Sequence, residues 1–171
     1  MTASFMTCSS GEKHISRYPG ATNCALIPVC RRADGSINSL QEHLSEFQER
    51  DTPCRICEAE TRRRHVFVNA PELLTFDFTK GPLELNHTLD IPIFGKPIAK
   101  YYLCGVIYFG HSHFTARIVN DGGVWYHDGL ASADTCHEDQ ITPEDMSSCR
   151  GRTANVTLYA DERHAELVDQ A

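Results

Sequence analysis

The stretch Asn-Asp-Gly-Gly at residues 120–123 constrains the fold more than any other part of the chain. Asp-Gly is typical of a tight turn in a β-hairpin. The segment "HFTARIV" before it alternates polar with apolar residues, and "VWYHD" follows it directly. The simplest register sets Val119 opposite Val124. The sequence therefore predicts two antiparallel strands, and this register decides which side chains share a face.

Alternation divides the predicted hairpin into an apolar and a polar face. We expect the core to lie against the face that carries Phe114, Ala116, Ile118, Trp125 and His127. The opposite face carries His113, Thr115, Arg117, Tyr126 and Asp128. On that face His113 is diagonal to Asp128, a separation that long side chains bridge. An imidazole held by a carboxylate has a fixed tautomer and a favoured cationic form, as a general base requires, although a purely structural pair is the alternative.

Two neighbouring histidines are weaker candidates for this chemistry. His127 falls on the face of Trp125, where a structural role is expected. His111 has the parity of His113 but lies farther from the carboxylate, where the strand begins. We therefore take His113 and Asp128 as the candidate catalytic residues.

The rest of the chain predicts one helix and a series of strands. Leu40, Leu44 and Phe47 recur at three- and four-residue steps, and Asn38 or Ser39 precedes them as a cap. The expected strands are "TNCALIPVC" near an edge, "HVFVN", "ELLTFDF", "AKYYLCGVIYF", the two hairpin strands and "ANVTLYA". Because strands dominate after residue 65, the fold class is α+β with a mainly antiparallel sheet.

Composition and charge exclude several classes of partner. The formal net charge is −7, which argues against a nucleic-acid groove or an anionic membrane surface. The basic run at 62–64 is expected to be a solvated surface. The chain has neither an apolar run of the length that a membrane span needs nor an N-terminal secretory signal. We expect an intracellular protein, cytoplasmic or nuclear, whose eight cysteines are buried thiols or metal ligands.

The segment 101–130 resembles the C-terminal catalytic box of the ubiquitin-specific cysteine proteases. In that family a strand of the form Y-x-L-x-G-V is followed by G-H-Y-x-A, then by a tryptophan and an aspartate or asparagine. The residues that match are Tyr102, Leu103, Gly105, Val106, His113, Phe114, Thr115, Ala116, Trp125 and Asp128. Ser112 replaces the glycine, Phe114 the tyrosine, and His127 the usual aromatic residue before the acid.

The resemblance extends over most of residues 8–162. Residues 36–78 look like the family's helix, C-x-x-C and following strands, and 154–163 look like its last strand. It implies half of a papain-like cysteine protease domain, with a finger and helix in 1–64, a palm sheet in 65–162 and a tail in 163–171. In this family the histidine is the general base and the acid orients it, which implies those roles for His113 and Asp128. The implied partner is ubiquitin or a ubiquitin-like modifier.

The resemblance also implies a zinc ribbon in the finger. Cys54-x-x-Cys57 is one knuckle of such a ribbon, and Cys8 lies where the other should begin, but Gly11 occupies the position of its second cysteine. His14 or Cys30 could supply a fourth ligand, although neither has the expected spacing. We expect Cys8, Cys54 and Cys57 to meet at the tip of the finger and to hold structural zinc weakly, the alternative being a ribbon that has lost its metal.

No segment resembles the family's nucleophile box. Asn23-Cys24 is superficially similar, but a strand pattern follows it. Cys104 is expected to be a packed strand residue, and Cys136 and Cys149 follow the acid. Three interpretations remain: a fragment of a deubiquitinating thiol protease whose missing N-terminal half-domain is supplied by upstream sequence or by a partner chain, a non-catalytic module that binds the modifier, and a β-rich domain with only ancestral resemblance.

Overall fold

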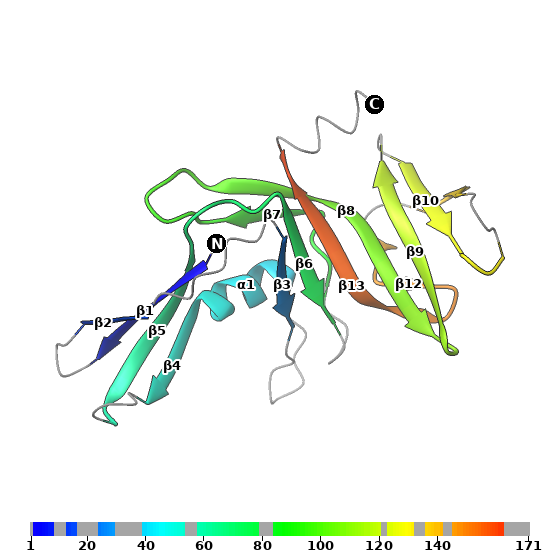
Figure 1. Cartoon of the computed structure of the whole chain (residues 1–171). Coiled ribbons are helices and arrows are strands. Elements are labelled where there is room, and N and C mark those ends of the chain that lie inside the picture. Colours follow the sequence, from blue (N-terminus) through cyan, green and yellow to red (C-terminus); the bar gives the residue numbers. More distant parts are fainter. Residues whose placement is uncertain are drawn as a thin grey trace.

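The structure, a computed structural model, describes residues 2–8, 13–16, 24–29, 39–53, 58–78, 84–120, 123–131, 136–141 and 145–162. These residues form two β-sheets and the helix α1 (Leu40–Gln48), which lies between the sheets (Figure 1). No helix among them is long and apolar enough to cross a membrane. The architecture is mainly antiparallel β with one helix, as the sequence predicts.

The smaller sheet has four antiparallel strands in the order β2-β1-β5-β4. Its strands are β1 (Thr2–Cys8), β2 (Lys13–Ser16), β4 (Glu49–Pro53) and β5 (Glu60–Phe67). The basic run at 62–64 belongs to the inner strand β5, where the register places Arg62, Arg63 and Arg64 opposite Asp51, Arg50 and Glu49.

The larger sheet has nine strands and carries the predicted hairpin. Its strands are β3 (Cys24–Pro28), β6 (Leu73–Asp77), β7 (Thr88–Ile91), β8 (Ala99–Gly110), β9 (His113–Asn120), β10 (Gly123–His127), β11 (His137–Asp139), β12 (Ser148–Cys149) and β13 (Arg152–Asp161). The main path runs β11-β10-β9-β8-β13-β6-β3, with β12 on β13 and β7 on β8 (Figure 1). Only the β3–β6 pair among these strands is parallel, and it places β3 at one edge, as Pro28 predicts.

Helix α1 is capped and docked by polar side chains. Ser39 Oγ accepts a hydrogen bond from the Glu42 N–H at 3.3 Å, which makes Ser39 the N-cap. The Gln41 side chain pairs with both backbone groups of Asp90, because its Oε1 accepts from the Asp90 N–H at 2.8 Å and its Nε2 donates to the Asp90 carbonyl at 3.0 Å. A glutamine amide thus occupies the open edge of β7 and fixes the helix against the larger sheet.

A β-bulge in β8 explains how one strand contributes to the core along its whole length. Gly105 pairs with Leu158 and Leu103 pairs with Tyr159, which leaves Cys104 as an extra residue. An extra residue resets the two-residue alternation of side chains. The side chains buried on either side of the bulge are Tyr101, Leu103, Val106 and Tyr108.

The predicted hairpin register is found, but the predicted core face is wrong. Val119 stands opposite Val124, and the pairs follow as expected to Ala116 and His127. The turn residues 121 and 122 lie outside the described residues. The apolar side chains are the exposed ones, at 55% for Phe114, 42% for Ile118 and 39% for Trp125. The buried face instead carries Thr115, Arg117, Val124 and Tyr126.

Arg117, the charged residue of this face, can be buried because other segments supply partners for it. Arg117 Nε donates to Asp139 Oδ2 and its Nη1 to the Ser148 carbonyl, both at 2.7 Å. Its guanidinium also lies 5.5 Å from the ring centroid of Tyr108. Once its charge and donors are satisfied, the long side chain fills the core as an apolar stem. We call the exposed side the outer apolar face; it carries Phe109, Phe114, Ile118 and Trp125.

The turn that joins β8 to β9 is strained. Gly110 pairs with His113, so only His111 and Ser112 form the connection, and both have left-handed backbone angles, with φ of 54° and 59°. Replacing Ser112 by glycine is expected to raise the free energy of unfolding by about 1 kcal/mol, because glycine adopts positive φ without a Cβ clash. Urea denaturation measures the gain. Ser112→Ala is the control, since it keeps the Cβ and should give no gain; a less stable glycine variant would contradict the left-handed turn.

Candidate functional site

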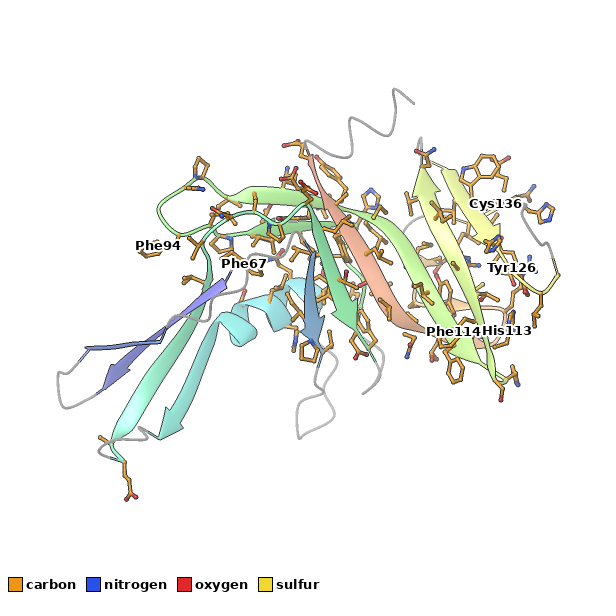
Figure 2. All side chains as sticks on the ribbon, viewed as in Figure 1. Phe67, Phe94, His113, Phe114, Tyr126 and Cys136 are labelled. Carbon is orange, nitrogen blue, oxygen red and sulfur yellow. The ribbon has the colours of Figure 1, made fainter. Side chains whose placement is uncertain are left out.

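The site consists of two side chains that the hairpin brings together. His113 is the first residue of β9, and Asp128 follows the last residue of β10. His113 Nε2 lies 2.7 Å from Asp128 Oδ1, and the two side chains are 20% and 15% exposed. The sequence predicted this proximity from the register. Figure 2 shows His113 at the end of the larger sheet far from the smaller sheet, with Tyr126 on the adjacent strand.

Four donors hold the carboxylate of Asp128. Its Oδ1 accepts from His113 and from the backbone N–H groups of Leu130 and Ala131, and its Oδ2 accepts from the hydroxyl of Tyr126 at 3.2 Å. The hydrogen bond from His113 contributes most to lowering the pKa of Asp128 to about 2; the other donors lower it further, while burial acts against them. The carboxylate is therefore ionised at neutral pH and fixed in orientation.

The contact assigns the two nitrogens of the imidazole. Because Nε2 faces an ionised carboxylate, Nε2 carries the proton and donates it. In the neutral ring Nδ1 is then the unprotonated nitrogen, with its lone pair available. The cation that forms when Nδ1 takes a proton is stabilised by Asp128. The pair can therefore abstract a proton from an acidic group placed at Nδ1.

The other two histidines are not part of this arrangement. His111 is exposed in the strained turn, with a φ of 54°. His127 is half-buried and belongs by alternation to the side of Trp125. The face of His127 is therefore the exposed one, whereas the sequence had predicted it to be the core face.

Three cysteines with described side chains are free thiols, and none is hydrogen-bonded to His113. Cys104 donates to the Leu158 carbonyl at 3.3 Å, and burial raises the pKa of its thiol. It lies six residues along β8 from the Gly110–His113 pair, which is roughly 20 Å in a strand. Burial likewise raises the pKa of Cys149, which is 1% exposed. Neither thiol has the lowered pKa of a nucleophile.

The remaining candidate thiols are also poorly placed. Cys136 is exposed and immediately precedes β11, one residue beyond the Tyr126–His137 pair. Cys24 begins β3, four strands away from β9 and therefore roughly 19 Å across the sheet. The described residues thus contain a base and its orienting acid without a matching thiol.

The expected metal ligands can be placed only in part. Cys54 and Cys57 lie outside the described residues, and Cys8 is the last residue of β1. Cys8 stands opposite Thr61, which stands opposite Thr52 of β4. The last residues of β1 and β4 therefore lie at the same end of the smaller sheet. Among the residues with described side chains, no three histidine, cysteine or acidic groups converge on a common point.

A cavity of about 490 Å³ lies elsewhere in the molecule. Its lining residues are Asn69, Ala70, Ile93, Lys96, Pro97, Ile98, Ala99, Lys100, Asp161 and Glu162. None of these belongs to the His113–Asp128 pair. The candidate site is therefore a partly open position at the sheet end and not this cavity.

Two residues near the site were not predicted from the sequence. The Tyr126 hydroxyl bonds Asp128, and the Arg150 guanidinium lies 3.8 Å from the Tyr126 ring centroid. Alternation had placed Tyr126 on the face of Asp128, so the sequence already indicated that these two side chains are neighbours. Arg150 is distant in the sequence from both, and nothing in its local pattern indicates this contact.

Comparisons with known proteins support the fold. No protein-family model and no curated protein matches the sequence. Among solved structures, the chain is similar to a chain of the SAGA DUB module Ubp8/Sgf11/Sus1/Sgf73 bound to monoubiquitin, with a TM-score of 0.64 and 13% identity. The match covers 94% of this chain and 40% of that chain. The chain thus shares a fold with part of a DUB module and spans less than half the length of the chain that it matches.

Proposed function

We propose that this chain provides the general-base part of a ubiquitin-specific thiol protease site. His113 acts as the base, and Asp128 orients it and stabilises its cation. The observation that supports this most is the 2.7 Å contact from Nε2 to Asp128 Oδ1, which leaves Nδ1 to accept the proton of a thiol. The fold shared with a module bound to monoubiquitin supports ubiquitin, or a modifier like it, as the partner.

The nucleophile comes from outside the described residues in this proposal. The thiols of Cys104 and Cys149 are buried with raised pKa values, and neither is bonded to His113. The expected N-terminal half-domain would supply the thiol and the donors that stabilise the oxyanion.

We also propose a zinc site and a cellular location. Cys8 and the last residues of β4 lie at the same end of the smaller sheet, which supports a ribbon tip formed with Cys54 and Cys57. We propose that this tip binds structural zinc weakly, because one of the four expected cysteines is replaced. The three free thiols agree with a reducing, intracellular compartment.

A second function follows from the same cysteine placement. Without a thiol at His113, the chain would bind the modifier and not cleave it. This binding module is the alternative to the protease proposal, because both use the same fold and differ only in the source of the nucleophile.

The test is incubation of residues 1–171 with a ubiquitin probe that carries an electrophilic C-terminus. We expect binding without covalent labelling, because catalytic groups of this kind act as a unit with their nucleophile. Intact mass spectrometry and calorimetry with monoubiquitin give the two readings. His113→Ala and His111→Asn are the matched variants, one at the base and one in the exposed turn.

Three outcomes separate the possibilities. Labelling of one cysteine that His113→Ala abolishes and His111→Asn preserves would show that the chain holds its own nucleophile. Binding without labelling leaves the base half-site and the binding module, which addition of a thiol-bearing N-terminal half-domain then distinguishes. Neither binding nor labelling would refute ubiquitin as the partner.

A further inference from the structure

The two oxygens of the Asp128 carboxylate have different partners. Oδ1 is the oxygen that faces His113, and it also accepts from the backbone of Leu130 and Ala131. Oδ2 accepts from the Tyr126 hydroxyl. Both oxygens lie off the Cβ–Cγ axis, so a hydrogen bond to either one opposes rotation of the carboxylate. The Tyr126 hydroxyl therefore adds a restraint at Oδ2 to those at Oδ1 and helps to keep Oδ1 turned toward the imidazole.

Tyr126 is itself held from the opposite side by an arginine. Its ring is 4% exposed, and the Arg150 guanidinium lies 3.8 Å from the ring centroid, within the range of a cation–π contact. Arg150 and Gly151 form the turn between β12 and β13, with left-handed φ angles of 48° and 79°. This turn determines where the guanidinium lies. A connected series of contacts thus runs from the β12–β13 turn to the imidazole.

We propose that Tyr126 is a positioning residue of the His113–Asp128 pair and that Arg150 acts through it by holding the phenol ring in place. The inference rests on the proposed function for its consequence in catalysis. Neither residue touches the reacting atoms: Tyr126 bonds the acid, and Arg150 contacts only Tyr126 in this series. Their effect is on the orientation of the carboxylate, and through it on which imidazole nitrogen carries the proton.

The experiment is a nuclear magnetic resonance measurement on the full chain, with and without the hydroxyl. In the unaltered chain at pH 7, the ring nitrogens of His113 should show the Nε2–H tautomer, and the Asp128 carboxyl should titrate near its pKa of about 2. In Tyr126→Phe the midpoint should rise by roughly one unit, because a hydrogen bond to the ionised form is lost. The Nε2–H population should fall several-fold relative to the other tautomer.

Matched variants separate positioning from stability. Tyr102→Phe removes another hydroxyl that donates to a carboxylate, that of Glu162 at 3.2 Å, and should change neither reading at the site. Arg150→Met should shift both readings in the direction of Tyr126→Phe, and Arg150→Lys should restore them in part because it keeps the cation. Thermal unfolding of each variant is recorded alongside.

The results that would refute this inference differ from the result that would refute the proposed function. If Tyr126→Phe lowers the unfolding temperature but leaves the Asp128 midpoint and the His113 tautomer unchanged, Tyr126 is structural and the inference is wrong. The tautomer reading at pH 7 decides the matter even where a variant unfolds in acid. Failure of the unaltered chain to bind ubiquitin would refute the proposed function while these readings still stand.

Discussion

Replacing Arg117 by alanine is expected to lower the free energy of unfolding by about 3–5 kcal/mol. Arg117 is 6% exposed and makes two hydrogen bonds of 2.7 Å, to Asp139 and to the Ser148 carbonyl. Its removal takes away the hydrogen-bond donor of the Asp139 carboxylate and of the Ser148 carbonyl. Chemical denaturation in urea measures the loss. It would be a large part of the stability of a domain of this size.

Two further variants show where the Arg117 effect comes from. Arg152→Ala removes an arginine that is only half-buried and donates at 3.3 Å to the Gly110 carbonyl, so its cost should stay below that of Arg117→Ala. The double variant Arg117→Met with Asp139→Leu should recover much of the loss, because no unpaired charge remains. If Arg117→Ala cost no more than a surface substitution, the ion pair would be solvated and the described burial wrong.

Replacing Phe76 by alanine is the second change with a large expected effect, again about 3–5 kcal/mol. Phe76 lies in β6 with 0% exposure, and its ring packs edge-on against Tyr159 of the neighbouring strand, with 5.7 Å between centroids. The substitution leaves a cavity between two strands that the pairing holds apart, so the site can collapse only in part. The midpoint of urea unfolding reports the change.

Phe94 provides the control for this cavity. It is 60% exposed and projects from the connection between β7 and β8, at the end of the molecule away from His113 (Figure 2). Phe94→Ala should alter the free energy of unfolding by less than about 0.5 kcal/mol. Equal losses for the two phenylalanines would show that Phe76 is not in a packed core.

The hairpin and the His113–Asp128 contact could be predicted because they depend on local sequence. The Asp-Gly turn sets Val119 opposite Val124, and alternation then carries the register to the site. Both steps use residues within one hairpin. The helix and its cap at Ser39 could be predicted for the same reason.

The burial of the hairpin could not be predicted, since it depends on residues far along the chain. Alternation correctly identified which side chains share each face of the hairpin. The apolar face was then assigned to the core because of its polarity, and this assignment was wrong. Arg117 is buried because Asp139 and the Ser148 carbonyl meet it, and the segment that supplies them shows no strand pattern in the sequence. The bulge at Cys104 likewise depends on the pairing with β13 and has no local signal.

The short connection before His113 has a consequence for how a ligand meets this site. Only His111 and Ser112 lie between the paired residues Gly110 and His113. The backbone of His113 is therefore fixed by the sheet and cannot reorient as a loop would. A hinged loop would place the imidazole only after binding and would lose ordering entropy then. Here that entropy is lost when the chain folds. The imidazole is therefore preorganised, and any fitting of shape during complex formation must be done by the partner.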